Sequence, residues 1–343
     1  MTLPERIAAL HRLGQEIRPD TNEFLAALMK RTAFHNGWFT PEAQRRSLDA
    51  VITEFLDGDK LRDWAAGYPE LAAPAPRRPK TVGLVLAGNI PLVGMHDLVT
   101  VFLSGHRAQI KLSSKDPYVL PYLLRLLGEV APATLPYFEI VDKLTAFDAI
   151  IATGSNNSSR YFEAYFGKYP HIIRRNRNAV AVLTGEEDRD ALRRLGDDVF
   201  SYFGLGCRNV SKLYVPEGYD FEPLLEVFHE WKVLQNHTKW KNNFDYNFAL
   251  LTLNKEAFHH NGAIILRRDE ALASHIAGLY YTTYTDLGAA AQEINERSGE
   301  IQLVVTRPGT LPFPTVDFGH AQQPGLTDYA DGVDTLAFLT TLP

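Results

Sequence analysis

The sequence predicts an α/β protein in which two doubly wound, mostly parallel sheets follow a helical N-terminus. Short apolar runs alternate with amphipathic segments from Thr81 onward, which is the pattern of parallel strands joined by helices. Before that point the apolar spacing is helical, from Leu3 to about Gly67. Within this region Thr40 is expected to cap a helix whose first residue is Pro41.

The expected strands form two sets. The first set is Thr81–Leu86, Ala108–Leu112, Phe138–Val141, Ala149–Ala152 and Ala179–Leu183. The second set is Lys212–Val215, Phe248–Leu253, Ala263–Leu266, Ile276–Thr282 and Ile301–Val305. The expected helices that cover them include Pro117–Val130, Ser158–Phe166, Asp188–Tyr202 and Phe221–Trp231. A proline-rich connector at 71–80 separates the N-terminal helices from the first sheet.

Composition excludes several classes of function. A chain of 343 residues is long enough for two domains, and its net charge of -6 gives no reason to expect nucleic-acid binding. A single cysteine rules out a disulfide within the chain and fits a reducing compartment. The sequence shows no signal segment and no apolar stretch of the roughly 20 residues that span a bilayer. We therefore expect a cytoplasmic protein without a membrane span.

The only cysteine, Cys207, lies behind two glycines in the run Phe203–Val210. Glycine allows the backbone, and hence a flat carbonyl, to come close to the sulfur. The next residue, Arg208, brings positive charge that would favour the nucleophilic thiolate. The alternative is that Cys207 is a small buried apolar residue, as isolated cysteines often are.

Asn89 follows the first expected strand in the run Ala87–Leu92, held between glycine and proline. Its side-chain NH2 could stabilise an oxyanion, or the Gly-Asn pair could simply form a turn. A second polar segment, Ile110–Pro117, ends a strand with Lys111, Ser113, Ser114 and Lys115 before a helix that Asp116 is expected to cap. This segment could hold the ribose and phosphates of a nucleotide, or it could be an ordinary polar strand end.

The third segment, Ile151–Ser158, contains Gly154-Ser155 between a strand and a helix start. Such a start offers unpaired backbone N–H groups and the positive end of the helix dipole to a pyrophosphate. The sequence lacks the G-x-G-x-x-G fingerprint, so the usual dinucleotide motif does not support this interpretation.

The order of these segments resembles the aldehyde dehydrogenase superfamily. Asn89 matches that family's oxyanion asparagine, Lys111 its ribose-binding lysine, Gly154-Ser155 its pyrophosphate helix, and Cys207 its nucleophile. Separations of 22 residues from Asn89 to Lys111 and 53 from Gly154 to Cys207 fit the family pattern.

Within the superfamily the chain is most similar to short acyl-CoA reductases of the bacterial luminescence (LuxC) type. This similarity extends to the tail Asp328–Asp334. It implies an aldehyde dehydrogenase-like fold with a helical segment 1–70 packed on the cofactor domain, a nucleotide-binding domain 71–184, a catalytic domain 185–306 and a tail 307–343.

Three departures from the superfamily pattern bear on the implied function. Oxidising members carry a glutamate upstream of the cysteine that activates the hydrolytic water, whereas the segment 172–177 has no carboxylate. An acyl-cysteine would then be reduced or returned to a thiol rather than hydrolysed. NAD-preferring members carry a glutamate at the ribose, where this chain has Ser114 followed by Lys115, which favours NADPH. The family's Glu-x-Phe-Gly-Pro segment is not visible at Ala271–His275.

Other candidate residues have weaker patterns. His171, 36 residues before Cys207, could accept the thiol proton, or it could be a polar loop residue after Pro170. The arginines at 174, 175 and 177 could bind coenzyme A phosphates or form a solvated basic face. The aromatic run Trp231–Tyr246 could line an acyl tunnel or serve in packing. The remaining histidines show no metal-ligand spacing, and we expect no metal site.

The resemblance and the residues together predict an NADPH-dependent acyl-CoA reductase that forms an acyl-cysteine at Cys207, with coenzyme A as part of the substrate. Two alternatives stay open. One is an aldehyde dehydrogenase that oxidises an aldehyde, and the other is an acyl-transfer subunit that loads an acyl group on Cys207 for a partner. The donor could be coenzyme A or an acyl carrier protein, and the sequence leaves a homo-oligomer open.

Overall fold

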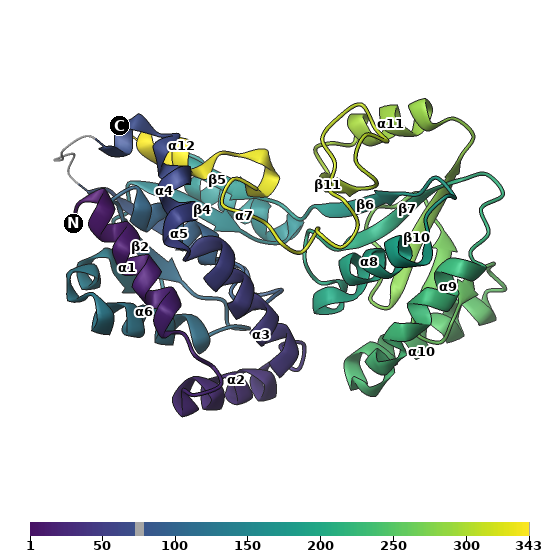
Figure 1. Ribbon diagram of the computed structural model, residues 1–343, viewed down its shortest axis with the longest axis horizontal. Coiled ribbons are helices and arrows are strands. Elements are labelled where there is room, and N and C mark those ends of the chain that lie inside the picture. The colour runs from purple at the N-terminus through teal and green to yellow at the C-terminus, as the bar shows by residue number, and fades with distance from the viewer. Residues whose placement is uncertain (73–78, 343) are drawn as a thin grey trace. The chain divides into compact units, whose positions relative to one another are not determined.

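The computed structural model describes residues 1–72 and 79–342, and the chain in it divides into two units. Unit 1 comprises Met1–Asn176 together with Pro324–Pro343, and unit 2 comprises Arg177–Gln323. Each unit has its own largely parallel sheet flanked by helices (Figure 1). This arrangement confirms the expected α/β class with two parallel sheets.

Unit 1 contains a five-stranded parallel sheet in the order β3-β2-β1-β4-β5. Its strands are β1 (Thr81–Val85), β2 (Arg107–Lys111), β3 (Phe138–Ile140), β4 (Ala149–Thr153) and β5 (His171–Arg174). The chain adds β2 and β3 on one side of β1 and then places β4 and β5 on the other. The point between β1 and β4 is therefore a topological switch point, where open α/β sheets bind ligands at the carboxyl ends of the strands.

The helices of unit 1 come mainly from the N-terminal segment and from the connections between strands. They are α1 (Leu3–Glu16), α2 (Glu23–His35), α3 (Pro41–Ala50), η1 (Val51–Phe55), α4 (Gly58–Ala66), η2 (Pro69–Ala72), α5 (Met95–Leu103), α6 (Val119–Val130), η3 (Pro132–Tyr137), α7 (Asn156–Phe166), η6 (Ala330–Gly332) and α12 (Thr335–Thr340). As expected, Thr40 caps α3 by accepting from the Ala43 N–H, and Pro41 is the first helical residue. Helix α1 packs against α5 and α6, so the N-terminal segment covers the helices of the sheet.

Unit 2 contains a six-stranded sheet in the order β11-β6-β7-β10-β9-β8, in which only β8 is antiparallel to its neighbour. Its strands are β6 (Asn178–Val182), β7 (Val210–Pro216), β8 (His259–His260), β9 (Ile265–Arg268), β10 (Gly278–Tyr284) and β11 (Ile301–Val305). Its helices are α8 (Arg189–Phe200), η4 (Ser201–Gly204), α9 (Glu222–Phe228), η5 (His229–Asn236), α10 (Thr238–Leu253) and α11 (Leu287–Glu296).

Unit boundaries and expected domain boundaries differ at two places. Residues 177–184, assigned to the nucleotide-binding domain from the sequence, contribute β6 to the sheet of unit 2. The tail is divided, because its part up to Gln323 belongs to unit 2 and the rest belongs to unit 1. The proline-rich connector at 71–80 lies for the most part outside the described residues.

The structure differs from the sequence-based expectation in several elements. Phe248–Leu253 was expected to be a strand, but it is the end of α10, which His237 caps by accepting from the Trp240 N–H. A short apolar run cannot be assigned to strand or helix from periodicity alone, so the error has a simple cause. Conversely, the edge strand β5 was missed, because only Ile172 and Ile173 carry its apolar signal.

Hydrogen bonds from aromatic side chains fasten the C-terminal tail to the rest of unit 1. Tyr329 accepts a hydrogen bond from Trp64 Nε1 at 2.8 Å, and Tyr68 donates to Asp334 at 2.7 Å. Tyr329 and Asp334 of the tail Asp328–Asp334 therefore have a structural role, because their side chains bind Trp64 and Tyr68. Among the described residues, no helix has the length and apolar character needed to cross a lipid bilayer.

A buried ion pair ties β5 to α5 and α12. The Arg174 guanidinium binds both carboxylate oxygens of Asp97, at 2.5 and 2.8 Å, and also donates to Thr335 at 2.9 Å. The two charged side chains are only 6% and 7% exposed, so each charge depends on the other for compensation.

Replacing Asp97 by Ala should therefore lower the free energy of unfolding by about 3–5 kcal/mol, because the Arg174 charge stays buried without its partner. Urea denaturation of the variant measures this loss. The control is Asp20→Ala, which removes an exposed ion pair with Arg45 and should change stability by less than about 1 kcal/mol. Equal effects of the two substitutions would contradict the assignment of Arg174–Asp97 as a structural anchor.

Candidate active site

The loop after β1 carries Asn89 to the carboxyl edge of the unit 1 sheet, and contacts on both sides hold it there. Ser47 of α3 donates to the Pro91 carbonyl at 2.7 Å, and Asp116 accepts from the Leu92 N–H at 3.0 Å. Leu92 has a positive φ of 55°, a strained conformation that these contacts stabilise. Asn89 itself is half-buried.

Asp116 does not have the role that the sequence predicted. Helix α6 begins at Val119 with Tyr118 as its N-cap and without a side-chain cap. The Asp116 carboxylate is instead buried beneath the Asn89 loop, and this burial raises its pKa. Its hydrogen bond to Leu92 makes Asp116 a support for the Asn89 loop rather than a helix cap.

The loop after β2 packs directly against the Asn89 loop. A Cβ added at Gly88 would lie 2.2 Å from Ser113 Oγ and 3.1 Å from Lys115 Cβ, so only glycine permits this approach. The end of α2 fixes the same loop, because His35 binds the Ser114 carbonyl at 2.7 Å. Lys111 is half-buried at the end of β2, whereas Ser114 and Lys115 are exposed.

The third loop follows β4 and leads into α7. Ser155 caps this helix by accepting from the Ser158 N–H at 3.2 Å. A Cβ at Gly154 would meet Ser158 and Phe162 at 2.8 and 2.9 Å, so glycine allows α7 to start close to the strand. Because β2, β1 and β4 are parallel neighbours, the three loops that follow them meet at one edge of the sheet, at the switch point.

His171 lies away from these loops. It is the first residue of β5 and pairs with Ile150, whereas Thr153, next to Gly154, pairs with Arg174. Three residues of strand, roughly 10 Å, therefore separate His171 from the level of Thr153, and Gly154 lies one residue beyond it. Its Nδ1 contacts the Tyr169 carbonyl at 2.8 Å. The role of general base stays a prediction for His171, and this placement at the amino end of a strand weighs against it.

The arginines of segment 174–177 do not form one basic face. Arg174 is buried in its ion pair with Asp97, and Arg175 contacts Glu163 at 3.5 Å. Arg177 belongs to unit 2 and donates to the Ser298 carbonyl at 3.2 Å. Arg174 therefore belongs neither to a phosphate site nor to a solvated basic surface.

In unit 2, Cys207 occupies a tight turn between η4 and β7. The Asn209 N–H donates to the Gly206 carbonyl at 3.1 Å, so Cys207 and Arg208 are the two central residues of a β-turn. Cys207 is half-buried. The chain enters this turn through left-handed residues, with φ values of 51° at Tyr202 and 58° at Phe203.

Asn209, which the sequence analysis did not single out, holds the turn from inside. Its Oδ1 accepts from the Gly206 N–H at 2.8 Å, and its Nδ2 donates to the carbonyls of Asp198 and Ser201 at 3.0 and 2.8 Å. Asn209 is only 2% exposed. An asparagine two residues after the only cysteine was the available sequence signal.

The expected acyl tunnel at Trp231–Tyr246 is not one continuous lining. Trp240 is buried and donates from Nε1 to the Ala263 carbonyl at 3.0 Å, whereas Tyr246 is 68% exposed. His237 lies with its ring 4.4 Å from that of Phe203, so the start of α10 packs against the segment that leads to Cys207. The described residues contain no cluster of three or more His, Cys, Asp or Glu placed to bind a metal ion.

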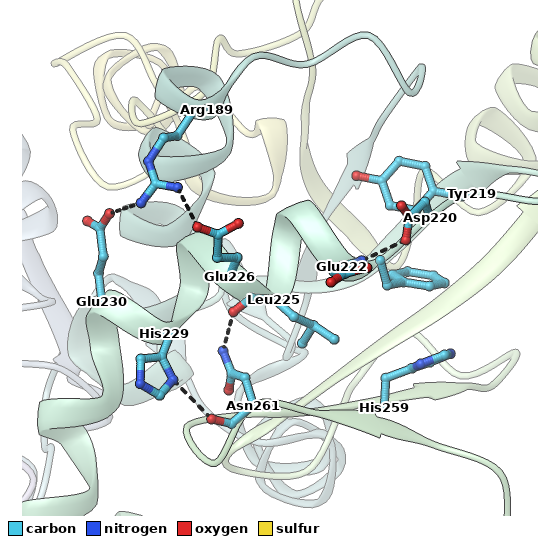
Figure 2. Close-up of a pocket in the computed structure, with 11 residues that line it drawn as sticks. Arg189, Tyr219, Asp220, Glu222, Leu225, Glu226, His229, Glu230, His259 and Asn261 are labelled. Atoms are coloured by element: carbon cyan, nitrogen blue, oxygen red, sulfur yellow. Dashed lines mark hydrogen bonds and ion pairs between the residues drawn. The ribbon is translucent and has the colours of Figure 1, made fainter.

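A separate pocket of about 970 Å³ lies in unit 2, next to α9 and the start of α8 (Figure 2). Arg189 bridges Glu226 and Glu230 there, at 3.2 Å from each. Cys207 follows the other end of α8, and the 12 residues of that helix span about 18 Å. This acidic pocket is therefore distinct from the surroundings of Cys207, and none of the sequence-predicted residues lines it.

Comparison with known proteins identifies a family and a fold. The sequence profile of the acyl-CoA reductase (LuxC) family matches residues 25–227, more than half of the chain. Comparison with curated proteins finds no match.

Several solved structures share the architecture. An NADP-dependent enzyme from E. coli has a TM-score of 0.64 and 14% identity over 92% of this chain and 78% of its own. Aldehyde dehydrogenase 21 from Physcomitrella patens, solved with succinate, has a TM-score of 0.63 and 15% identity over 90% and 74%. Aldehyde dehydrogenase C from Pseudomonas syringae, solved with NAD+ and octanal, has a TM-score of 0.60 and 13% identity over 86% and 70%. At these identities the likeness confirms the aldehyde dehydrogenase-like fold.

Asn209→Ala should destabilise the protein by about 2–4 kcal/mol, because the half-buried Gly206 N–H loses its side-chain acceptor and the carbonyls of Asp198 and Ser201 each lose a donor. It should also change the rate at which iodoacetamide alkylates Cys207, since the turn loses its internal support. Chemical denaturation and alkylation kinetics measure the two effects. Asn243→Ala, which removes an exposed amide from α10, is the control. A stability equal to that of the control would show that Asn209 does not hold the turn.

Proposed function

The chain belongs to the acyl-CoA reductase (LuxC) family, and on this basis we propose that it reduces an acyl thioester to an aldehyde. NADPH is the proposed reductant, and an acyl-cysteine at Cys207 is the proposed intermediate. The observation that carries this proposal is the turn at Cys207, which presents the chain's only thiol on a rigid backbone next to a glycine.

The proposed chemistry begins at the sulfur of Cys207. Its thiolate attacks the thioester carbonyl, the bond between the acyl carbon and the sulfur of coenzyme A breaks, and coenzyme A leaves as a thiol after taking up a proton. The acyl carbon then accepts a hydride, which a bound nicotinamide would supply, and breaking its bond to the Cys207 sulfur releases the aldehyde and, after uptake of a proton, regenerates the thiol. Hydrolysis to an acid is not favoured, because the segment upstream that carries the activating glutamate in oxidising relatives has Arg174 in a buried ion pair instead.

Asn89 is the proposed donor to the developing oxyanion. The support of its loop by Ser47 and Asp116 favours this role, because a donor acts on a transition state best when it is held in place before the reaction. The backbone N–H of Cys207 is the second proposed donor. Losing one such donor typically costs about 3 kcal/mol in the barrier.

The loops at the switch point of unit 1 fit a dinucleotide. Because Gly88 has no Cβ, the loops after β1 and β2 can lie in contact. The start of α7 offers backbone N–H groups beyond Gly154-Ser155. Lys111 and Ser113 are proposed to hold the ribose, with Ser114 and Lys115 at its 2'-phosphate. A bound nicotinamide supplies the hydride for the reduction.

The substrate class follows from the proposed chemistry and not from a defined acyl pocket. Acyl-CoA and an acyl carrier protein present the same thioester to Cys207, so either could be the donor. Incubating the protein with a panel of acyl-CoAs, with and without NADPH, tests the proposal. The expected result is a mass increase on Cys207 without NADPH and aldehyde release with it. Acylation without consumption of NADPH would instead indicate an acyl-transfer subunit, and oxidation of an added aldehyde to an acid would indicate an aldehyde dehydrogenase.

Cys207→Ser should abolish both the acyl-enzyme and turnover, because a hydroxyl near its normal pKa is a far weaker nucleophile than a thiolate. The fold should be retained, since the hydroxyl is similar in size. Intact-protein mass spectrometry and aldehyde formation are the two readouts. Unchanged turnover in this variant would exclude the covalent mechanism.

NADPH should be preferred over NADH by about tenfold, which corresponds to roughly 1.4 kcal/mol. The exposed Ser114 offers no negative charge to repel a 2'-phosphate, and Lys115 offers a cation. Ser114→Glu should reverse the preference, whereas the neutral control Ser114→Gln should keep it. The ratio of kcat/KM for the two cofactors is the measurement. An equal or higher value for NADH in the unmodified protein would refute the assignment.

A further inference from the structure

A buried carboxylate connects the end of α8 to a distant part of unit 2. Asp198 lies in the last turn of α8 and is completely buried. Its Oδ2 accepts from the Gly319 N–H at 2.7 Å, and its Oδ1 accepts from the Ala321 N–H at 2.9 Å. Both oxygens therefore hold one short backbone segment, residues 317–321, which we call the arm.

The arm in turn holds the residue next to the cysteine. Arg208 Nε donates to the Ala321 carbonyl at 2.6 Å. Ala321 thus binds Asp198 through its N–H and Arg208 through its carbonyl. Because Cys207 and Arg208 are the central residues of one β-turn, a continuous series of hydrogen bonds leads from Asp198 to the turn that carries the thiol.

The environment of Asp198 is unfavourable for a charge. Burial raises its pKa to about 6, and the hydrogen bonds from Gly319 and Ala321 offset only part of this effect. Other charged or titratable groups around it are Asp197 on α8 and His320 on the arm. Arg194 of α8 packs against Gly319, and a Cβ there would lie 3.0 Å from Arg194 Cβ. The two hydrogen bonds to the arm therefore hold this carboxylate in a site that disfavours its charge.

We propose that Asp198 is a positioning residue for Cys207, which fixes the arm so that the Ala321 carbonyl orients Arg208 and the turn that presents the thiol. This role rests on the proposed function, in which Cys207 is the nucleophile. It goes beyond that function by assigning part of the reactivity of Cys207 to a side chain that does not touch the substrate.

The first test compares Asp198→Asn with Asp197→Asn, which makes the same change one residue earlier on α8. Rapid-quench measurements with acyl-CoA separate the acylation rate constant from the substrate dissociation constant. Asp198→Asn should lower the rate constant by about 10–100-fold and change the dissociation constant by less than about threefold, because a misplaced reacting group loses rate rather than binding. Asp197→Asn should match the unmodified protein.

The pH profile gives a second readout. Below about pH 6 Asp198 takes up a proton and one of its oxygens becomes a donor, so it can no longer accept both arm N–H groups. The acylation rate should therefore fall as the pH drops through about 6. This fall should be absent in Asp198→Asn and retained in His320→Gln, which tests whether the neighbouring imidazole is responsible instead.

A third variant, Arg208→Met, removes the hydrogen bond from Arg208 to the Ala321 carbonyl. It tests the proposal even if Asp198→Asn does not fold. It should lower the acylation rate constant on its own. Combined with Asp198→Asn it should add little, since both act through the Ala321 carbonyl.

Normal acylation in Asp198→Asn or in Arg208→Met, or fully additive effects of the two, would overturn the positioning role while leaving the proposed function intact. Absence of acylation in the unmodified protein would refute the proposed function instead.

Discussion

The contact between the loops after β1 and β2, where Gly88 meets Ser113, is the constraint on which the candidate cofactor site depends. A side chain at position 88 would overlap with Ser113 Oγ, so the two loops can share one edge of the sheet only because position 88 is glycine. The strand order places the start of α7 at the same edge. The N-terminal helices contribute as well, because α2 binds the Ser114 carbonyl and α3 binds the Asn89 loop.

In unit 2, the turn that carries Cys207 is held by hydrogen bonds on both sides of the cysteine. Left-handed residues before Cys207 store strain, and buried polar groups balance it. Asn209 supports the turn from within, and the arm reaches it through Arg208. The residues that flank the cysteine are thus each held by a hydrogen bond, Gly206 by the Asn209 side chain and Arg208 by the Ala321 carbonyl.

Strong local signals made much of the fold predictable from the sequence. The switch from helical spacing to alternating strands and helices located both sheets, and Gly154 and Ser155 marked the start of α7. Tertiary contacts decided the rest. The sequence pattern at Asp116 predicts a helix cap, but the carboxylate accepts from the Leu92 N–H instead. The pattern at Arg174 predicts an exposed cation, but the guanidinium is buried in an ion pair with Asp97. Neither partner lies near in sequence, so no local pattern could reveal these roles.

The central claim is that the acyl group bound to Cys207 leaves as an aldehyde after receiving a hydride. The most direct measurement uses NADPH deuterated at the transferable position, together with an acyl-CoA that the protein accepts. The account predicts an aldehyde that carries one deuterium at its carbonyl carbon, formed together with one equivalent of free coenzyme A. Release of coenzyme A with a stable acyl-enzyme and no deuterated aldehyde would contradict it.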